Sequence, residues 1–164
     1  HKWSEKWSYL YKMLILYTTI SGNSKRFCDK ICNGATEITE ANCFNILSEP
    51  YIIIIPSYED VTPMEECIQD LLETGNNLDY CVGVMGSGNM NFEGFGLYCI
   101  TAKRLSEQYD LNVLRRFELL GDKNDVDFSK SLINYIDNYQ LSPNEKWSEV
   151  GIKFMTEELV NGNV

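Results

Sequence analysis

Blocks of apolar residues alternate with amphipathic stretches along the chain. Short apolar runs rich in branched side chains are typical of strands in a parallel sheet that is covered on both faces. The pattern predicts strands over residues 13–17, 36–38, 51–55, 80–85 and 113–119, with a short strand at 43–46 as an alternative to irregular structure. Apolar positions repeated at helical spacing predict helices over residues 24–32, 63–73, 97–109 and 125–139.

The order of these elements predicts the fold. Strands that alternate with helices form α/β domains in which right-handed crossovers join parallel strands. The strands fit a flavodoxin-like three-layer sandwich, a five-stranded parallel sheet of order 2-1-3-4-5 with helices on both faces. Ligands of such sheets bind at the carboxyl ends of the strands, where strands 1 and 3 are neighbours. The loops at 19–24, 57–62 and 86–96 follow strands 1, 3 and 4, so we expect them to meet at one edge.

The flavodoxin-like domain is predicted over residues 13–140, with a segment on either side. Residues 1–12 form an aromatic arm that is native or partly non-native sequence. Residues 141–164 form a C-terminal extension that contains an amphipathic stretch over 146–159. We expect this stretch to pack on the domain, the alternative being a partly disordered tail. The side chains expected to make the contact are Trp147, Ile152 and Phe154.

Composition and charge exclude several classes of function. The net charge of −10 over 164 residues argues against binding to nucleic acid or to anionic lipid. No run of about 18 apolar residues and no apolar N-terminal core occur, so neither a membrane span nor a signal peptide is predicted. Six cysteines without a Cys-x-x-Cys pair, and a single histidine at position 1, argue against a zinc site and against Ser-His or Cys-His catalysis. We interpret the cysteines as core thiols of a reduced, cytoplasmic protein.

A polar loop links the first strand to the first helix. Thr19, Ser21, Gly22, Asn23 and Ser24 lie at a helix N-terminus, where free N–H groups and the helix dipole attract an anion. Gly22 allows a close backbone approach. The loop has neither the lysine of a Walker A motif nor a Gly-x-Gly-x-x-Gly pattern, which argues against nucleoside triphosphates and dinucleotides. A monophosphate cradle remains, with an ordinary turn as the alternative.

Two further loops are expected to face this cradle. Ser57, Tyr58 and Glu59 follow the third strand, where Tyr58 either stacks on a planar ring or covers the sheet end. Acidic side chains beside such a ring would disfavour added electrons. The segment from Gly86 to Gly96 is rich in glycine and asparagine, which makes it costly to order. A glycine peptide in it could turn toward a ring nitrogen; a flexible connection is the alternative.

Motifs in all three loops resemble the NrdI family, whose members are small flavodoxin-like proteins that work with class Ib ribonucleotide reductase. The motifs are Tyr17-x-x-x-Ser21-Gly22-Asn23-Ser24 with Arg26-Phe27, Pro56-Ser57-Tyr58, and Gly83-Val84-Met85-Gly86-Ser87-Gly88-Asn89-x-Asn91-Phe92. Similar segments at 98–103 and 117–119 extend the resemblance over about residues 13–139. The chain departs from the family pattern in its two ends and in a lengthened 92–96 segment.

The resemblance implies an FMN site, with the phosphate in the first loop and the ring between the two later loops. The residues it assigns to FMN are Thr19, Ser21, Gly22, Asn23, Ser24, Ser57, Tyr58, Glu59, Gly86, Ser87, Gly88, Asn89, Asn91, Phe92 and Tyr98. It implies that an upstream electron donor reduces the protein, which then converts O2 to superoxide. The oxidant would pass to the small, radical-bearing subunit of class Ib ribonucleotide reductase and assemble its dimanganese/tyrosyl radical cofactor. The flavin would carry the chemistry, with no catalytic side chain and no bound metal.

Two other functions fit parts of the sequence. A general electron-transfer flavodoxin would share the fold and the phosphate loop, without activating a reductase subunit. A flavin-free module of the response-regulator type would need an acidic cluster after the first strand, where this chain has hydroxyl side chains.

Overall fold

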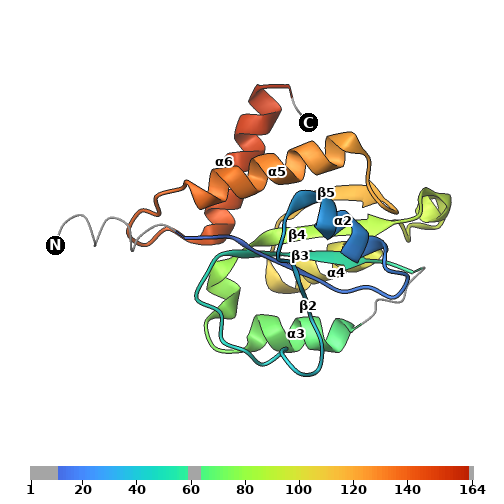
Figure 1. Cartoon of the computed structure of the whole chain (residues 1–164), viewed down its shortest axis with the longest axis horizontal. Helices are drawn as coiled ribbons and strands as arrows, with labels where there is room; N and C mark the ends of the chain where they lie inside the picture. Colours follow the sequence, from blue (N-terminus) through green and yellow to red (C-terminus); the bar gives the residue numbers. More distant parts are fainter. Residues whose placement is uncertain (1–10, 59–63, 163–164) are drawn as a thin grey trace.

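A five-stranded parallel sheet forms the centre of the molecule (Figure 1). The computed structural model describes residues 11–58 and 64–162. The strands are β1 (Leu14–Tyr17), β2 (Thr36–Glu37), β3 (Tyr51–Pro56), β4 (Cys81–Gly88) and β5 (Val113–Glu118). Their order in the sheet is β2-β1-β3-β4-β5, which confirms the predicted topology.

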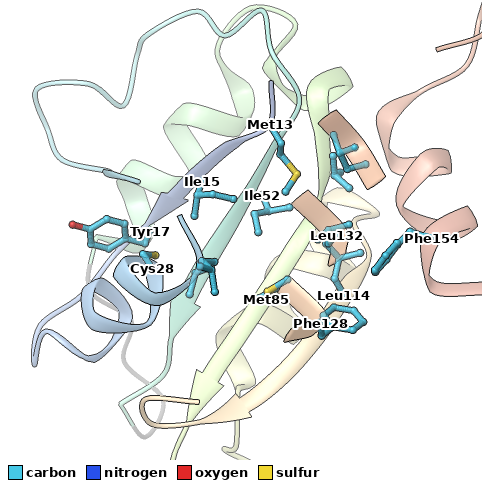
Figure 2. Packing of buried hydrophobic residues seen from close by; sticks show 14 of the residues in the cluster. Met13, Ile15, Tyr17, Cys28, Ile52, Met85, Leu114, Phe128, Leu132 and Phe154 are labelled. Carbon is cyan, nitrogen blue, oxygen red and sulfur yellow. The ribbon is translucent and has the colours of Figure 1, made fainter. Parts of the chain in front are cut away.

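Helices cover both faces of this sheet (Figure 1). They are α2 (Asn23–Ile31), α3 (Glu65–Glu73), α4 (Ile100–Tyr109), α5 (Lys123–Asp137) and α6 (Trp147–Val160), with 3-10 helices η1 (Asn77–Tyr80) and η2 (Met90–Phe95). The β3 side chains divide the core between the faces. Ile52 and Ile54 pack with α2, α5 and α6, whereas Ile53 and Ile55 pack with α3 and α4. Figure 2 shows the first cluster, including Leu114, Leu132 and Phe154.

The C-terminal segment is a helix that packs on β4, so the prediction of a packed extension is confirmed. Trp147, Val150 and Phe154 of α6 are buried, and the ring of Phe154 lies 5.3 Å from that of Phe128 on α5. The expectation for Ile152 was wrong, because its side chain is 52% exposed. Helical periodicity places positions 147, 150, 151 and 154 on one face and turns position 152 toward solvent.

Three local expectations need correction. Residues 43–46 form no strand, because Asn42 closes a turn by accepting from the Thr39 N–H (2.9 Å) and donating to the Glu37 carbonyl (2.8 Å). Helix α3 begins at Glu65, after Met64 with φ of 60°; the expected cap at Thr62 and Pro63 lies outside the described residues. Helix α4 begins at Ile100 and not at residue 97, because the preceding Cys99 also has a positive φ, 54°.

All six cysteines are free thiols, in agreement with the prediction of core thiols. Five are buried, and Cys32 is half-buried. Burial raises the pKa of the Cys99 thiol to about 11 and that of Cys81 to about 12, which keeps both groups neutral near pH 7. Among residues 11–58 and 64–162, no helix is long and apolar enough to cross a bilayer.

We predict that Gly151→Ala will destabilise the protein. A Cβ at this position would lie 2.6 Å from the Val82 carbonyl oxygen of β4, so α6 would have to move away from the sheet. We expect a loss of about 1–3 kcal/mol in the free energy of unfolding, measured by denaturant titration. Gly34→Ala is the matched control, because a Cβ there has no described atom within 4 Å. Equal stability of the two variants would contradict close packing of α6 on β4.

Candidate functional site

A cavity of about 220 Å³ opens at the carboxyl edge of the sheet, where the segments after β1, β3, β4 and β5 meet. Because β1 and β3 are neighbours and their connections leave in opposite directions, the loops after them spread apart and leave a crevice. The residues that line the cavity are Ser21, Asn23, Pro56, Ser57, Tyr58, Ser87, Gly88, Asn89, Phe92 and Leu119. The three polar loops therefore meet as the sequence predicted.

The first loop enters helix α2 through a left-handed glycine. Gly22 has φ of 87°, a conformation that glycine adopts without steric cost, and it precedes the first helical residue, Asn23. The Gly22 N–H donates to Thr19 Oγ1 (2.9 Å), and the Asn23 N–H approaches Ser21 Oγ (3.4 Å). The loop thus turns its backbone donors inward, toward its own hydroxyl groups.

Two buried hydroxyl groups in this loop lack a hydrogen-bond partner among the described residues. Thr18 Oγ1 lies at the end of β1, and Ser24 Oγ lies in the first turn of α2; both residues are 0% exposed. A buried hydroxyl without a partner costs free energy. A ligand oxygen bound at the start of α2 could satisfy the Ser24 hydroxyl, so this loop fits an anionic group.

Arg26 adds a positive charge beside the first loop, although the sequence pattern did not predict it as a site residue. Its guanidinium donates from Nη1 to Asn23 Oδ1 (3.1 Å) and to the Ser21 carbonyl (3.5 Å). The signal was available in the sequence, because a residue three positions after the start of a helix lies beside that start. Pro56 and Leu119 also line the cavity without having been predicted.

Tyr58 connects the third-strand loop to the first loop. Its phenolic oxygen accepts hydrogen bonds from the Ser21 N–H (3.0 Å) and, at 3.4 Å, from the Ile20 N–H, and it shares a 2.7 Å hydrogen bond with Ser21 Oγ. Partial burial raises the pKa of Tyr58, but hydrogen bonds from Ser21, Ile20 and Thr19 outweigh burial and lower the pKa overall. The Tyr58 hydroxyl is therefore bonded to the first loop, and Tyr58 also lines the cavity.

The glycines of β4 serve close packing against α4. A Cβ at Gly86 would lie 2.9 Å from the Cβ atoms of Ala102 and Cys99, and one at Gly88 would lie 3.0 Å from the Cys99 nitrogen. Gly88 also accepts from the Leu119 N–H (2.9 Å). The segment expected to be a loop from Gly86 onward is therefore strand up to Gly88.

The segment after β4 is the short 3-10 helix η2. Asn89 caps it by accepting from the Asn91 N–H (2.9 Å), and the Glu118 carboxylate accepts from the Met90 N–H (3.0 Å). The Leu97 N–H donates to the Phe92 carbonyl (3.1 Å) and closes the segment. These hydrogen bonds position Asn89 and Phe92 in the cavity lining. The segment is therefore a hydrogen-bonded 3-10 helix and not the flexible connection that was the alternative from the sequence.

The fourteen predicted site residues that the structure describes fall into three groups. Eight line the cavity: Ser21, Asn23, Ser57, Tyr58, Ser87, Gly88, Asn89 and Phe92. Thr19, Gly22 and Ser24 belong to the first loop without lining the cavity. Gly86 lies under α4, Asn91 lies in η2, and Tyr98 lies beside Gly88 with the Arg116 guanidinium 5.7 Å from its ring centroid. Glu59 lies outside the described residues.

Comparison with known proteins agrees with this geometry. Residues 15–130 match the family model described as "NrdI Flavodoxin like". The chain belongs to the NrdI flavodoxin-like family. It is 37% identical over 127 residues to Protein NrdI of Wigglesworthia glossinidia brevipalpis, covering 74% of this chain and 88% of that protein. It is 28% identical over 151 residues to a putative NrdI-like protein of Streptococcus pneumoniae, covering 77% of this chain and 94% of that protein.

Solved structures support the flavodoxin fold of this NrdI family member. Oxidised Flavodoxin 2 from Bacillus cereus superposes with a TM-score of 0.55 at 21% identity, over 75% of this chain and 95% of that one. The flavodoxin of Streptococcus pneumoniae TIGR4 gives a TM-score of 0.53 at 18% identity, over 74% of this chain and 94% of that one. At these identities the likeness concerns the fold alone.

We predict that Gly86→Ala will lower stability because the added Cβ would collide with Ala102 and Cys99. The expected loss is about 1–3 kcal/mol in the free energy of unfolding by denaturant titration. Gly94→Ala in η2 is the control, since a Cβ there has no described atom within 4 Å. A fully stable Gly86→Ala variant would show that this glycine does not serve helix packing.

Proposed function

We propose that this protein binds FMN, with the phosphate at the start of α2. The support is the unpartnered Ser24 hydroxyl, the left-handed Gly22 and the nearby Arg26 guanidinium, all at one helix N-terminus. Thr19, Ser21 and Asn23 would complete the phosphate contacts. Backbone N–H groups and a single cation suit one phosphate group, in keeping with the absence of a Walker lysine.

The flavin ring would occupy the cavity beside this cradle. Tyr58 and Phe92 offer aromatic surfaces on it, and Ser57, Ser87 and Asn89 offer polar groups for the ring edge. Gly88 lines the cavity at the end of β4, so the ring would lie near its backbone. The family resemblance also assigns four residues that are not among the described residues lining the cavity. We propose that they act indirectly, by positioning the loops around the ring; they are Glu59, Gly86, Asn91 and Tyr98.

The function we propose is generation of superoxide for a ribonucleotide reductase. When bound and reduced, flavin supplies one electron to O2, and the protein contributes the position and exposure of the ring. The recipient would be the small, radical-bearing subunit of a class Ib enzyme, whose dimanganese centre the oxidant would activate. An upstream electron donor would return the protein to its reduced form. The observation that carries this proposal is the match to the NrdI family over residues 15–130.

A general electron-transfer flavodoxin is the second candidate. The fold that this chain shares with two solved flavodoxins is compatible with either candidate, since the phosphate loop and the ring site would be the same in both. The two candidates differ in the partner and in the fate of O2.

We predict that the FMN-loaded, reduced protein, mixed with air and a manganese-loaded class Ib small subunit, will generate a tyrosyl radical detectable by electron paramagnetic resonance. The same mixture without O2 is the control and should give no radical. Absence of the radical, together with good turnover as a one-electron carrier, would favour the electron-transfer flavodoxin. A protein that takes up no FMN would overturn both candidates.

We predict that Arg26→Gln will weaken FMN binding by about two- to fivefold at low salt, and by less at high salt, because an exposed cation near the phosphate is screened by ions. Flavin fluorescence titration measures the effect. Lys25→Gln is the matched control, since the ammonium of Lys25 pairs with Asp29 (3.3 Å) on the outer side of α2. Equal FMN affinities of the two variants would show that Arg26 does not contribute to phosphate binding.

A further inference from the structure

The first loop satisfies its own backbone donors with hydroxyl oxygens. The N–H of Gly22 donates to Thr19, that of Asn23 approaches Ser21, and those of Ile20 and Ser21 donate to the Tyr58 phenol. Two of these four donors therefore bond hydroxyls of the first loop itself, and the other two bond Tyr58, which comes from the loop after β3. Among the described residues that accept from these four N–H groups, Tyr58 is thus the one that a different segment supplies.

We infer that the Tyr58 hydroxyl competes with the phosphate of the cofactor for this cradle and thereby weakens the binding of FMN, while it leaves the binding of riboflavin unaffected. The inference rests on the proposed FMN site. The Ser21 N–H is a single donor and now lies 3.0 Å from Tyr58 Oη. A phosphate oxygen that takes this N–H must displace the phenol, and the 2.7 Å bond between Tyr58 Oη and Ser21 Oγ is exchanged in the same step.

The effect differs between FMN and riboflavin because their terminal groups differ in charge. Hydrogen bonds to an anionic oxygen are about twice as strong as those between neutral groups, so a phosphate displaces the neutral phenol readily. The Arg26 guanidinium donates to the Ser21 carbonyl (3.5 Å), so its positive charge lies near the Ser21 N–H group. This charge would attract a phosphate but not a neutral hydroxyl. Riboflavin ends in a neutral hydroxyl in place of the phosphate, so it gains little by displacing Tyr58. The phenol would therefore stay in the cradle when riboflavin occupies the ring site.

The inference assigns Tyr58 a role different from that of a phosphate ligand. A ligand would donate its proton to a phosphate oxygen, and its loss would weaken FMN binding. A competitor holds the donors that the phosphate needs, and its loss would strengthen FMN binding. The sign of the change in affinity therefore separates the two roles.

The test is titration of the 164-residue Tyr58→Phe chain with FMN and with riboflavin, followed by flavin fluorescence. We expect FMN to bind about threefold to tenfold more tightly than to the unsubstituted protein, the range that corresponds to one lost competing hydrogen bond. Riboflavin affinity should change by less than about twofold, because riboflavin does not displace the phenol. Tyr109→Phe is the matched control: it removes a tyrosine hydroxyl bonded to Glu73 on α3, at a distance from the cavity lining, and should change neither affinity.

Unchanged or weaker FMN binding by Tyr58→Phe would overturn the inference while leaving the FMN site in place. Inorganic phosphate gives a readout that needs no flavin. It should raise the melting temperature of Tyr58→Phe more than that of the unsubstituted protein, and an equal rise would also overturn the inference. If neither protein binds FMN, the proposed function fails by itself, and the phosphate measurement still decides the role of Tyr58.

Discussion

The complete burial of β3 is the constraint on which the rest of the structure depends. All side chains from Tyr51 to Ile55 are 0% exposed, so both faces of this strand must be covered. Helices on both faces are the solution, and they require crossover connections between parallel strands. Parallel strands direct all their carboxyl ends to one edge. The polar loops after β1, β3 and β4 therefore meet at this edge because helices cover both faces of the sheet.

Close approach between helices and the sheet is the second condition, and glycine meets it at several positions. Gly86 and Gly88 allow the start of α4 to reach β4, and Gly151 allows α6 to reach the backbone of β4 at Val82. The first two contacts fix the end of β4, where Gly88 and Asn89 enter the cavity wall. Packing far inside the sheet thus sets the shape of the surface at its edge.

The cradle at the start of α2 combines two opposing properties. Its exposed donors are held by hydroxyls of Thr19, Ser21 and Tyr58, whereas the buried hydroxyl of Ser24 has no partner among the described residues. A loop of this kind keeps its shape through weak neutral hydrogen bonds. An anion can replace them with stronger ones, because charge-assisted bonds exceed neutral bonds in strength.

The sequence by itself determined the strands, their order and the meeting of three loops, because apolar runs such as Tyr51–Ile55 can be buried in only a few ways. It also indicated the phosphate loop, because hydroxyls and a glycine before a helix are a local pattern. The sequence did not determine where side chains point across the sheet. The partner of the Tyr58 hydroxyl, 37 residues away at Ser21, is one case, and the neighbours of Gly86 on α4 are another. Only the tertiary structure decided these contacts, since they join segments distant in sequence, and pairings of that kind leave no periodicity in the chain.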